Sequence, residues 1–432
     1  MKHTNSVGRY ARAGLCVVLV LGVVPIADGY SVLTHEAIID ATWKDNIVPL
    51  LLKRFPNASP DELLKAHAYA YGGAIIQDMG YYPFGSKFFS DLTHYVRSGD
   101  FVLNLLDEAT DLNEYAFALG AVSHYVADND GHPVATNRVV PIMFPKLQQK
   151  FGRTITYGDN PAAHLKVEFS FDVIQVAQGN YAPEAYHDFV GFEVAQASLE
   201  RAFLKTYSID MSNLFVSEDL AIGTYRYTIS SILPTMTKAA WSLKKDEIQK
   251  AQPSATRKKF IYSLSRSSYR KKWGKDYKQP GFGARLIAFM FRVFPKVGPF
   301  KALAFQATPP AAETMFMRSF NETLERYRAL LVASDHGVLL LPNQNFDTGE
   351  PTKPGVYRLA DDTYAKLLGK LDGKPVSSEL RADILNFYSN PNAPLATKRD
   401  DKAWKKVMNE LDTLRAAEEV DHSVAGGNGA KP

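Results

Sequence analysis

Cysteine is almost absent from this chain of 432 residues. The single cysteine, Cys16, lies in an apolar segment near the start of the sequence. A disulfide framework is therefore excluded, and so are thiolate metal sites and a cysteine nucleophile in the body of the chain. No Ser-His pattern suggests another protein nucleophile. Any metal site must consequently be built from His, Asp and Glu side chains.

Strand-like patterns and internal repeats are also scarce, whereas helical patterns recur along the chain. Residues 113–128 carry a nearly all-apolar stripe, which is typical of a buried helix. Thr34 is predicted to cap a helix that begins at His35. Further helices are expected at 61–74, 161–178, 192–205 and 310–334, with one or two more between 361 and 414. The expected fold class is mainly α: a multi-helix bundle with a mostly helical C-terminal extension.

The N-terminal segment has the pattern of an export signal. Three basic residues precede an apolar run at 13–26, which is too short for a comfortable membrane span. Small residues at 27 and 29 predict cleavage before Tyr30, and hence export to the periplasm or secretion. The alternative is an uncleaved N-terminal anchor. The expected organisation is a signal peptide at 1–29, a helical domain at 30–240, a basic and amphipathic segment at 241–305, a C-terminal helical region at 306–419 and a disordered tail at 420–432.

Positive charge is concentrated in one part of the chain. Residues 244–301 hold 16 Lys and Arg but only three acidic residues, although the whole chain has a net charge of +4. The basic stretch includes Trp273 and is followed by an apolar stretch beginning at Phe282. Residues 257–296 therefore suit contact with an anionic membrane surface. One alternative is that this stretch binds single-stranded nucleic acid. The other is that it is a solvated loop followed by a core helix.

Two His-x-x-x-acid pairs are the most informative motifs. His124 and Asp128 are four residues apart, as are His164 and Glu168. On a helix such residues lie one turn apart on the same face, so both can reach one metal ion at roughly 2.0–2.2 Å. His132 follows Asp128 by four residues, beyond an Asp130-Gly131 pair that predicts a turn. Asp130 is an alternative to Asp128 as a ligand, although its spacing from His124 fits a helix face less well.

Three further residues are candidate ligands. Asp78 ends an apolar stretch, where a carboxylate is costly to bury without a cation; the alternative is a helix cap. His94 is either a ligand or a polar residue satisfied by its surroundings. His35 follows the predicted cleavage point by five residues, so the free α-amino group and carbonyl oxygen of Tyr30 could chelate a metal together with His35. That ligand would exist only after cleavage.

This series of residues resembles the zinc-dependent phospholipase C family and the related single-strand-specific zinc nucleases. In that superfamily an N-terminal residue and a nearby His, then Asp, His, His-x-x-x-Asp, His and His-x-x-x-Glu or Asp, bind three zinc ions. The resemblance covers about residues 30–205, and it implies that 30–240 is a catalytic domain around a trinuclear zinc site. The implied metal ligands are Tyr30, His35, Asp78, His94, His124, Asp128, His132, His164 and Glu168.

The resemblance also implies a reaction. A hydroxide bridging two zinc ions would attack phosphorus, Asp128 would bridge two metals, and Asp78 would ligate a metal and orient or deprotonate the nucleophile. Glu168 is like the phospholipases, which predicts phospholipids as substrate, whereas the spacing from Tyr30 to His35 is like the nucleases. The alternatives are therefore a zinc-dependent single-strand nuclease and a catalytically inactive membrane-associated protein.

Overall fold

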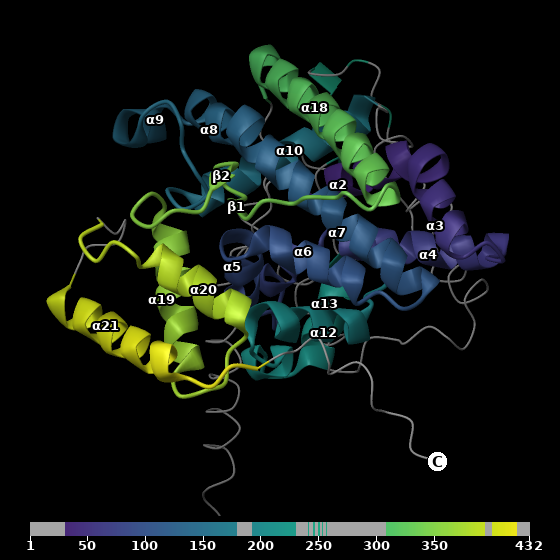
Figure 1. The fold of residues 1–432 in the computed structure, drawn as a ribbon. Helices are drawn as coiled ribbons and strands as arrows, with labels where there is room; N and C mark the ends of the chain where they lie inside the picture. The colour runs from purple at the N-terminus through teal and green to yellow at the C-terminus, as the bar shows by residue number, and fades with distance from the viewer. Residues whose placement is uncertain are drawn as a thin grey trace, which may run out of the picture.

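The computed structural model describes residues 31–178, 192–229, 308–393 and 400–420, together with a few isolated positions between 241 and 256. The predicted signal peptide, Tyr30, the basic and amphipathic residues 257–296 and nearly all of the predicted tail lie outside the described residues. Within the described parts the protein is mainly helical, as the sequence predicts (Figure 1). In these parts, no helix is both long enough and apolar enough to cross a membrane.

The α-helices come in three stretches of the chain. They are α2 (Val32–Thr42), α3 (Val48–Arg54), α4 (Pro60–Gly73), α5 (Lys87–Tyr95), α6 (Ser98–Asp107), α7 (Leu112–Gly131), α8 (Asn137–Met143), α9 (Pro145–Phe151) and α10 (Pro161–Gln178); then α12 (Gln196–Tyr207) and α13 (Glu218–Tyr227); then α18 (Pro310–Asp335), α19 (Arg358–Leu371), α20 (Ser378–Phe387) and α21 (Asp401–Ala416).

Short elements connect these helices. The helical turns are η1 (Trp43–Ile47), η2 (Ile76–Tyr81), η3 (His132–Thr136) and η4 (Met211–Leu214). Two strands, β1 (Gln344–Asn345) and β2 (Glu350–Pro351), pair antiparallel between α18 and α19. This pair of strands is too short to form a layer of its own.

Helix α7 forms the centre of the bundle. Its carboxylate cap, Asp111, accepts hydrogen bonds from the backbone N–H groups of Asn113 and Glu114, and almost every side chain that follows is buried. Glycines allow α4 to pack directly on it: a Cβ at Gly120 would lie 2.1 Å from the carbonyl oxygen of Ala70. This close packing fixes the position of the ligand-bearing half of α7.

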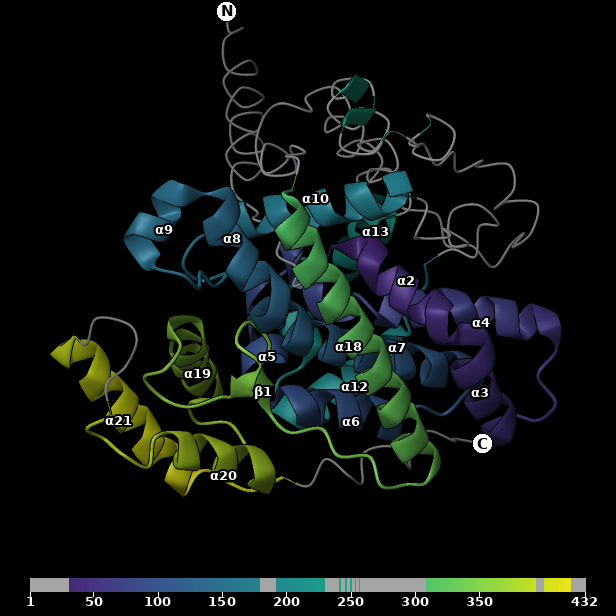
Figure 2. The ribbon, with the colours of Figure 1, turned by 90° about the horizontal axis from the view of Figure 1, so that it is seen from above.

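The C-terminal part of the chain packs on the same central helix. Helix α18 crosses over α7 in both views (Figures 1 and 2). The hydroxyl of Tyr327 on α18 donates to the carbonyl oxygen of Leu119 on α7 at 2.8 Å, and the ring of Phe316 stacks on Phe171 of α10. One hydrophobic core runs from Val32 in α2 to Leu414 in α21. The C-terminal helices are therefore part of the structure that holds α7 in place.

Candidate metal centre

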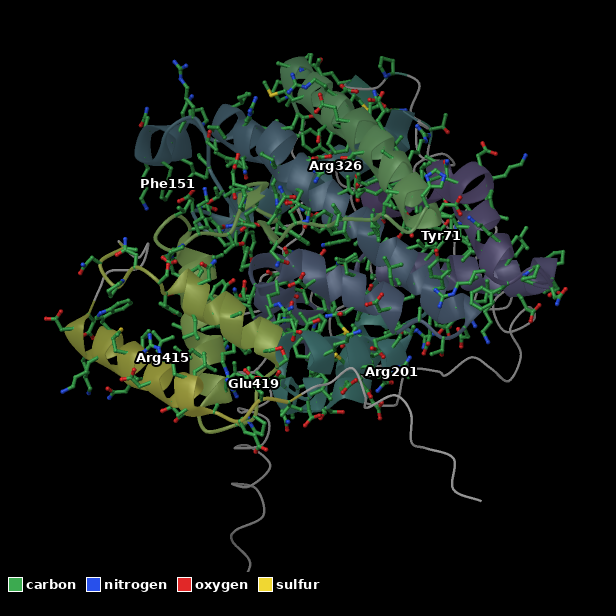
Figure 3. The ribbon with its side chains drawn as sticks, viewed as in Figure 1. Tyr71, Phe151, Arg201, Arg326, Arg415 and Glu419 are labelled. Atoms are coloured by element: carbon green, nitrogen blue, oxygen red, sulfur yellow. The ribbon has the colours of Figure 1, made fainter. Side chains whose placement is uncertain are left out.

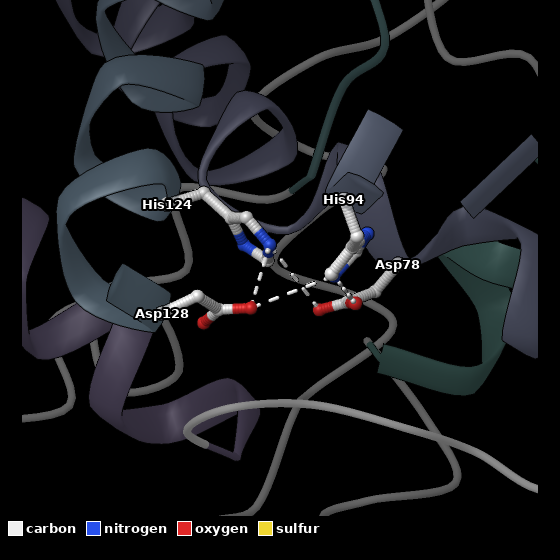
Figure 4. A group of neighbouring side chains, drawn as sticks. All are labelled: Asp78, His94, His124 and Asp128. Carbon is white, nitrogen blue, oxygen red and sulfur yellow. Dashed lines mark ion pairs between the residues drawn. The ribbon is translucent and has the colours of Figure 1, made fainter. Parts of the chain in front are cut away.

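Two groups of buried acidic and imidazole side chains lie at the middle of the bundle. Within each group one potential ligand atom of every residue lies within 4.8 Å of the others. The first group is Asp78, His94, His124 and Asp128, whose side chains converge on one point in Figure 4. The second group is His132, His164 and Glu168. The structure thus brings together the side chains that the two sequence pairs and their neighbours predicted.

The first group is assembled by three elements. Asp78 comes from η2, His94 from α5, and His124 and Asp128 from successive turns of α7. The Nε2 atom of His94 lies 3.2 Å from Asp78 Oδ1 and 3.5 Å from Asp128 Oδ2. The Nε2 atom of His124 lies 3.3 Å from Asp128 Oδ2 and 3.8 Å from Asp78 Oδ2. Two nitrogens and two carboxylates therefore surround a single small volume.

The second group joins α10 to the end of α7. The Nδ1 atom of His164 lies 3.4 Å from Glu168 Oε1, and the Nε2 atom of His132 lies 3.9 Å from the same oxygen. The turn predicted at Asp130-Gly131 is wrong, because α7 continues to Gly131 and passes directly into η3 at His132. The helical path carries His132 onward from Asp128, so one continuous stretch of chain supplies ligands to both groups.

Backbone carbonyls fix the tautomer of four of these imidazoles. A carbonyl oxygen can only accept a hydrogen bond, so the ring nitrogen facing it must carry the proton. The pairs are His94 Nδ1 to Ser90 at 2.8 Å, His124 Nδ1 to Ala74 at 3.0 Å, His132 Nδ1 to Phe346 at 2.9 Å and His164 Nε2 to Ile155 at 2.6 Å. In each ring the other nitrogen faces the carboxylates and is therefore the atom that is placed to bind a metal.

The buried atoms at the centre of the two groups fit a cation. Among the described residues, both carboxylate oxygens of Asp128 and Glu168 lack a hydrogen-bond partner, as do His124 Nε2, His132 Nε2 and His164 Nδ1. Leaving so many polar atoms unsatisfied in an apolar interior is costly. Imidazole nitrogens and carboxylates without thiolates are a donor set for zinc, among other divalent metals. A bound divalent metal at each group would satisfy these atoms.

The pKa shifts of residues in the two groups also fit a bound cation. Burial opposes ionisation of Asp128, but the nearby His124, His94 and His132 outweigh it and hold the pKa of this carboxyl well below its usual range. Burial raises the pKa of Glu168 well above its usual range in the absence of a cation. Burial also lowers the pKa of His164, which keeps that ring neutral. A bound metal would replace the proton on Glu168.

His35 adjoins the first group from α2. Its Nε2 atom lies 3.5 Å from Asp128 Oδ1, and its ring stacks on His124 with centroids 4.6 Å apart. The helix does not begin at His35 with a Thr34 cap, as predicted, but at Val32. The carboxylate of Asp172 takes the place of a local cap, because it accepts from the backbone N–H groups of Leu33 and Thr34 and from the Thr34 hydroxyl. Asp172 thereby holds His35 against α7.

Asp130 points away from the two groups. Its Oδ1 atom accepts a hydrogen bond from Arg326 Nη1 of α18 at 2.7 Å; Arg326 is labelled in Figure 3. Asp130 belongs to neither group of candidate ligands in the described part of the chain. The geometry therefore selects Asp128 over Asp130 as the acidic residue that faces the imidazoles.

Sequence reasoning missed two contributions to this centre. Asp172 follows Glu168 by four residues on α10, so the same spacing rule that paired His164 with Glu168 could have found it. The other contribution comes from Phe346 and Asp347, which approach His132 from the loop after β1. They lie more than 200 residues from His132 along the chain, in an Asn-rich loop, and no local pattern marks them.

Comparison with known protein families finds a match to the part of the chain that holds the two groups. Residues 34–215 match the model of the family described as zinc dependent phospholipase C. The matched region includes both groups of side chains and ends before α13. No curated protein and no solved structure matches the chain.

Proposed function

We propose that this zinc-dependent hydrolase cleaves the phosphodiester bond of phospholipid head groups, because residues 34–215 belong to the zinc-dependent phospholipase C family. The observation that carries the proposal is the pair of buried ligand groups, which are joined by the continuous path of α7 and η3. Two metal positions side by side suit displacement at phosphorus, where charge on both the attacking and the leaving oxygen must be stabilised.

Each group would hold zinc through its own side chains. His94, His124, Asp78 and Asp128 would bind one ion, and His132, His164 and Glu168 another. His35 with the amino group and carbonyl oxygen of Tyr30 would complete a third position, which gives up to three zinc ions per chain. Bound zinc would lower the pKa of water toward neutrality and polarise the phosphate oxygens.

Two carboxylates have distinct roles in this proposal. Asp128 presents Oδ1 to His35 and Oδ2 to His94 and His124, so its two oxygens can serve two metal positions. Asp78 faces His94 and His124 from the opposite side and would bind one ion while it orients the attacking water and accepts its proton. The carbonyl contacts of the imidazoles orient the rings, so that the opposite ring nitrogens face the metal positions.

A matched pair of substitutions tests the assignment. Asp128→Asn removes the proposed bridging carboxylate, whereas Asp130→Asn makes the same change two residues away, at the side chain that Arg326 holds. Hydrolysis of phosphatidylcholine by the zinc-loaded protein should fall by at least about 10²-fold in Asp128→Asn and stay within a few-fold in Asp130→Asn. A wild-type protein with full zinc but without chelator-sensitive phosphodiesterase activity would overturn the proposal.

The short spacing from Tyr30 to His35 supports a second candidate, a zinc-dependent single-strand nuclease. Rates on phosphatidylcholine vesicles and on single-stranded RNA, measured with the same zinc-loaded sample, decide between the two. Faster cleavage of the lipid supports the phospholipase, and faster cleavage of the RNA supports the nuclease. Absence of both activities would favour the third alternative, an inactive membrane-associated protein.

Two further features belong to the proposal. The protein is exported after cleavage before Tyr30, so that the amino group of Tyr30 becomes available. Residues 257–296 hold the enzyme at an anionic membrane surface through their cationic and aromatic side chains. Sedimentation with vesicles that contain an anionic lipid, compared with neutral vesicles, tests the second feature.

A further inference from the structure

The loop after β1 reaches the metal centre from the C-terminal part of the chain, outside the region that matches the family. The carbonyl oxygen of Phe346 accepts a hydrogen bond from His132 Nδ1 at 2.9 Å, and Asp347 Oδ1 lies 3.4 Å from the same nitrogen. A carbonyl and a carboxylate thus both face the side of the His132 ring opposite to Nε2, which is the atom that faces Glu168.

The same loop also contacts the first ligand group. The backbone N–H of Phe346 donates to the carbonyl oxygen of His94 at 3.2 Å. The ring of Phe346 packs against the imidazoles of His94 and His124, with centroids 5.1 and 6.0 Å apart. One loop residue therefore touches ligands of both groups, and it supplies part of their apolar wall.

Asp347 is itself held by a dedicated set of contacts. Its carboxylate accepts hydrogen bonds from the hydroxyl groups of Tyr95, at 2.8 Å, and Tyr357. Its carbonyl oxygen accepts from Asn137 Nδ2 at 2.7 Å, and its N–H donates to Asn345 Oδ1 at 3.0 Å. The side chain is only 2% exposed. A deeply buried carboxylate that accepts from two hydroxyl groups, on a residue whose backbone is also hydrogen-bonded, has a defined position relative to His132.

We propose that Asp347 is a positioning residue of the metal centre, which orients His132 and increases its affinity for metal. A carboxylate that faces the non-ligating nitrogen of a metal-bound His raises the basicity of the ligand and fixes the ring. The C-terminal part of the chain is thus required to complete the site. This inference rests on the proposed function, because it assumes that His132 binds zinc.

The test compares zinc affinity in two Asp-to-Asn variants of the full chain. Asp347→Asn keeps an acceptor for the tyrosine hydroxyls but removes the charge beside His132. Asp412→Asn makes the same change on the exposed surface of α21 and serves as the matched control. Affinity is measured by competition with a chromophoric zinc chelator, and the thermal midpoint of each metal-free variant is measured in parallel.

We expect Asp347→Asn to weaken the binding of the zinc ion at His132 by about 10–100-fold, with Asp412→Asn unchanged. Asp347→Ala, which also deprives Tyr95 and Tyr357 of their acceptor, should in addition lower the midpoint of the metal-free protein. Zinc affinity of Asp347→Asn within twofold of wild type would overturn the inference alone. Wild-type protein that takes up no zinc would overturn the proposed function together with it.

Discussion

Removal of metal is the perturbation with the largest predicted effect on stability. The side chains of Asp128 and Glu168 are 0% exposed, and their carboxylate oxygens have no hydrogen-bond partner among the described residues. Without a cation each must either stay charged in the interior or take up a proton. Both alternatives cost folding free energy that bound zinc would restore.

The size of the effect follows from binding linkage. A ligand that binds only the folded protein stabilises it by about 4.1 kcal/mol at a concentration 1,000 times its Kd. Two ligand groups therefore contribute about 8 kcal/mol, which is comparable to the roughly 5–15 kcal/mol of a whole domain. At about 2–4 °C per kcal/mol for a unit of 150–250 residues, chelation should lower the melting temperature by roughly 15–30 °C.

Thermal unfolding followed by circular dichroism measures this shift in zinc-saturated, chelated and zinc-restored samples. His164→Ala removes a ligand of the second group only, so it should keep about half of the zinc-dependent shift. Equal melting temperatures with and without zinc would refute the reasoning. A full-sized shift in His164→Ala would refute the assignment of the second group.

Three further predictions concern packing, titration and processing. In a urea titration, Gly120→Ala should destabilise the protein by roughly 3 kcal/mol, because the new Cβ would collide with the backbone of α4. Gly223→Ala is the control: its Cβ meets no neighbour within 4 Å, so it should stabilise the protein by about 0.5–1 kcal/mol. Burial raises the pKa of Asp172 to about 6 from a usual value of 3.8. The contribution of this carboxyl group to the free energy of unfolding is therefore complete below about pH 4 and is lost as pH rises through 6. Asp172→Asn should abolish that loss of about 3 kcal/mol in the unfolding free energy of the chelated protein, and an unchanged pH profile would contradict the assignment. Protein carrying one extra residue before Tyr30 should hold one zinc ion fewer by elemental analysis, and an equal content would exclude the terminal amino group as a ligand.

The local patterns predicted most of the helices and the ligand groups. The helix expected at 161–178 is α10, and the one expected at 310–334 is α18, which ends one residue later. The spacing of His124 from Asp128 and of His164 from Glu168 is itself a property of helices, so each pair could be placed without knowledge of the tertiary fold. Local spacing is enough when both ligands come from one element.

Features that depend on distant parts of the chain could not be predicted in this way. Asp130 and Gly131 are typical turn residues, but α7 continues through them. Helix α18 packs at this point, and its Arg326 binds Asp130. Thr34 has the composition of a cap, yet Asp172 satisfies the start of α2 from another helix. The contact of Asp347 with His132 joins segments that no periodicity connects, and only the folded chain brings them together.

The zinc content of the mature protein tests the central claim most directly. Protein that begins at Tyr30 is reconstituted with zinc, exchanged exhaustively into metal-free buffer and subjected to elemental analysis. Two ligand groups, with the additional position at His35, predict two to three zinc ions per chain. Zinc well below one ion per chain after reconstitution would contradict the account, because the buried groups would then not be a metal centre.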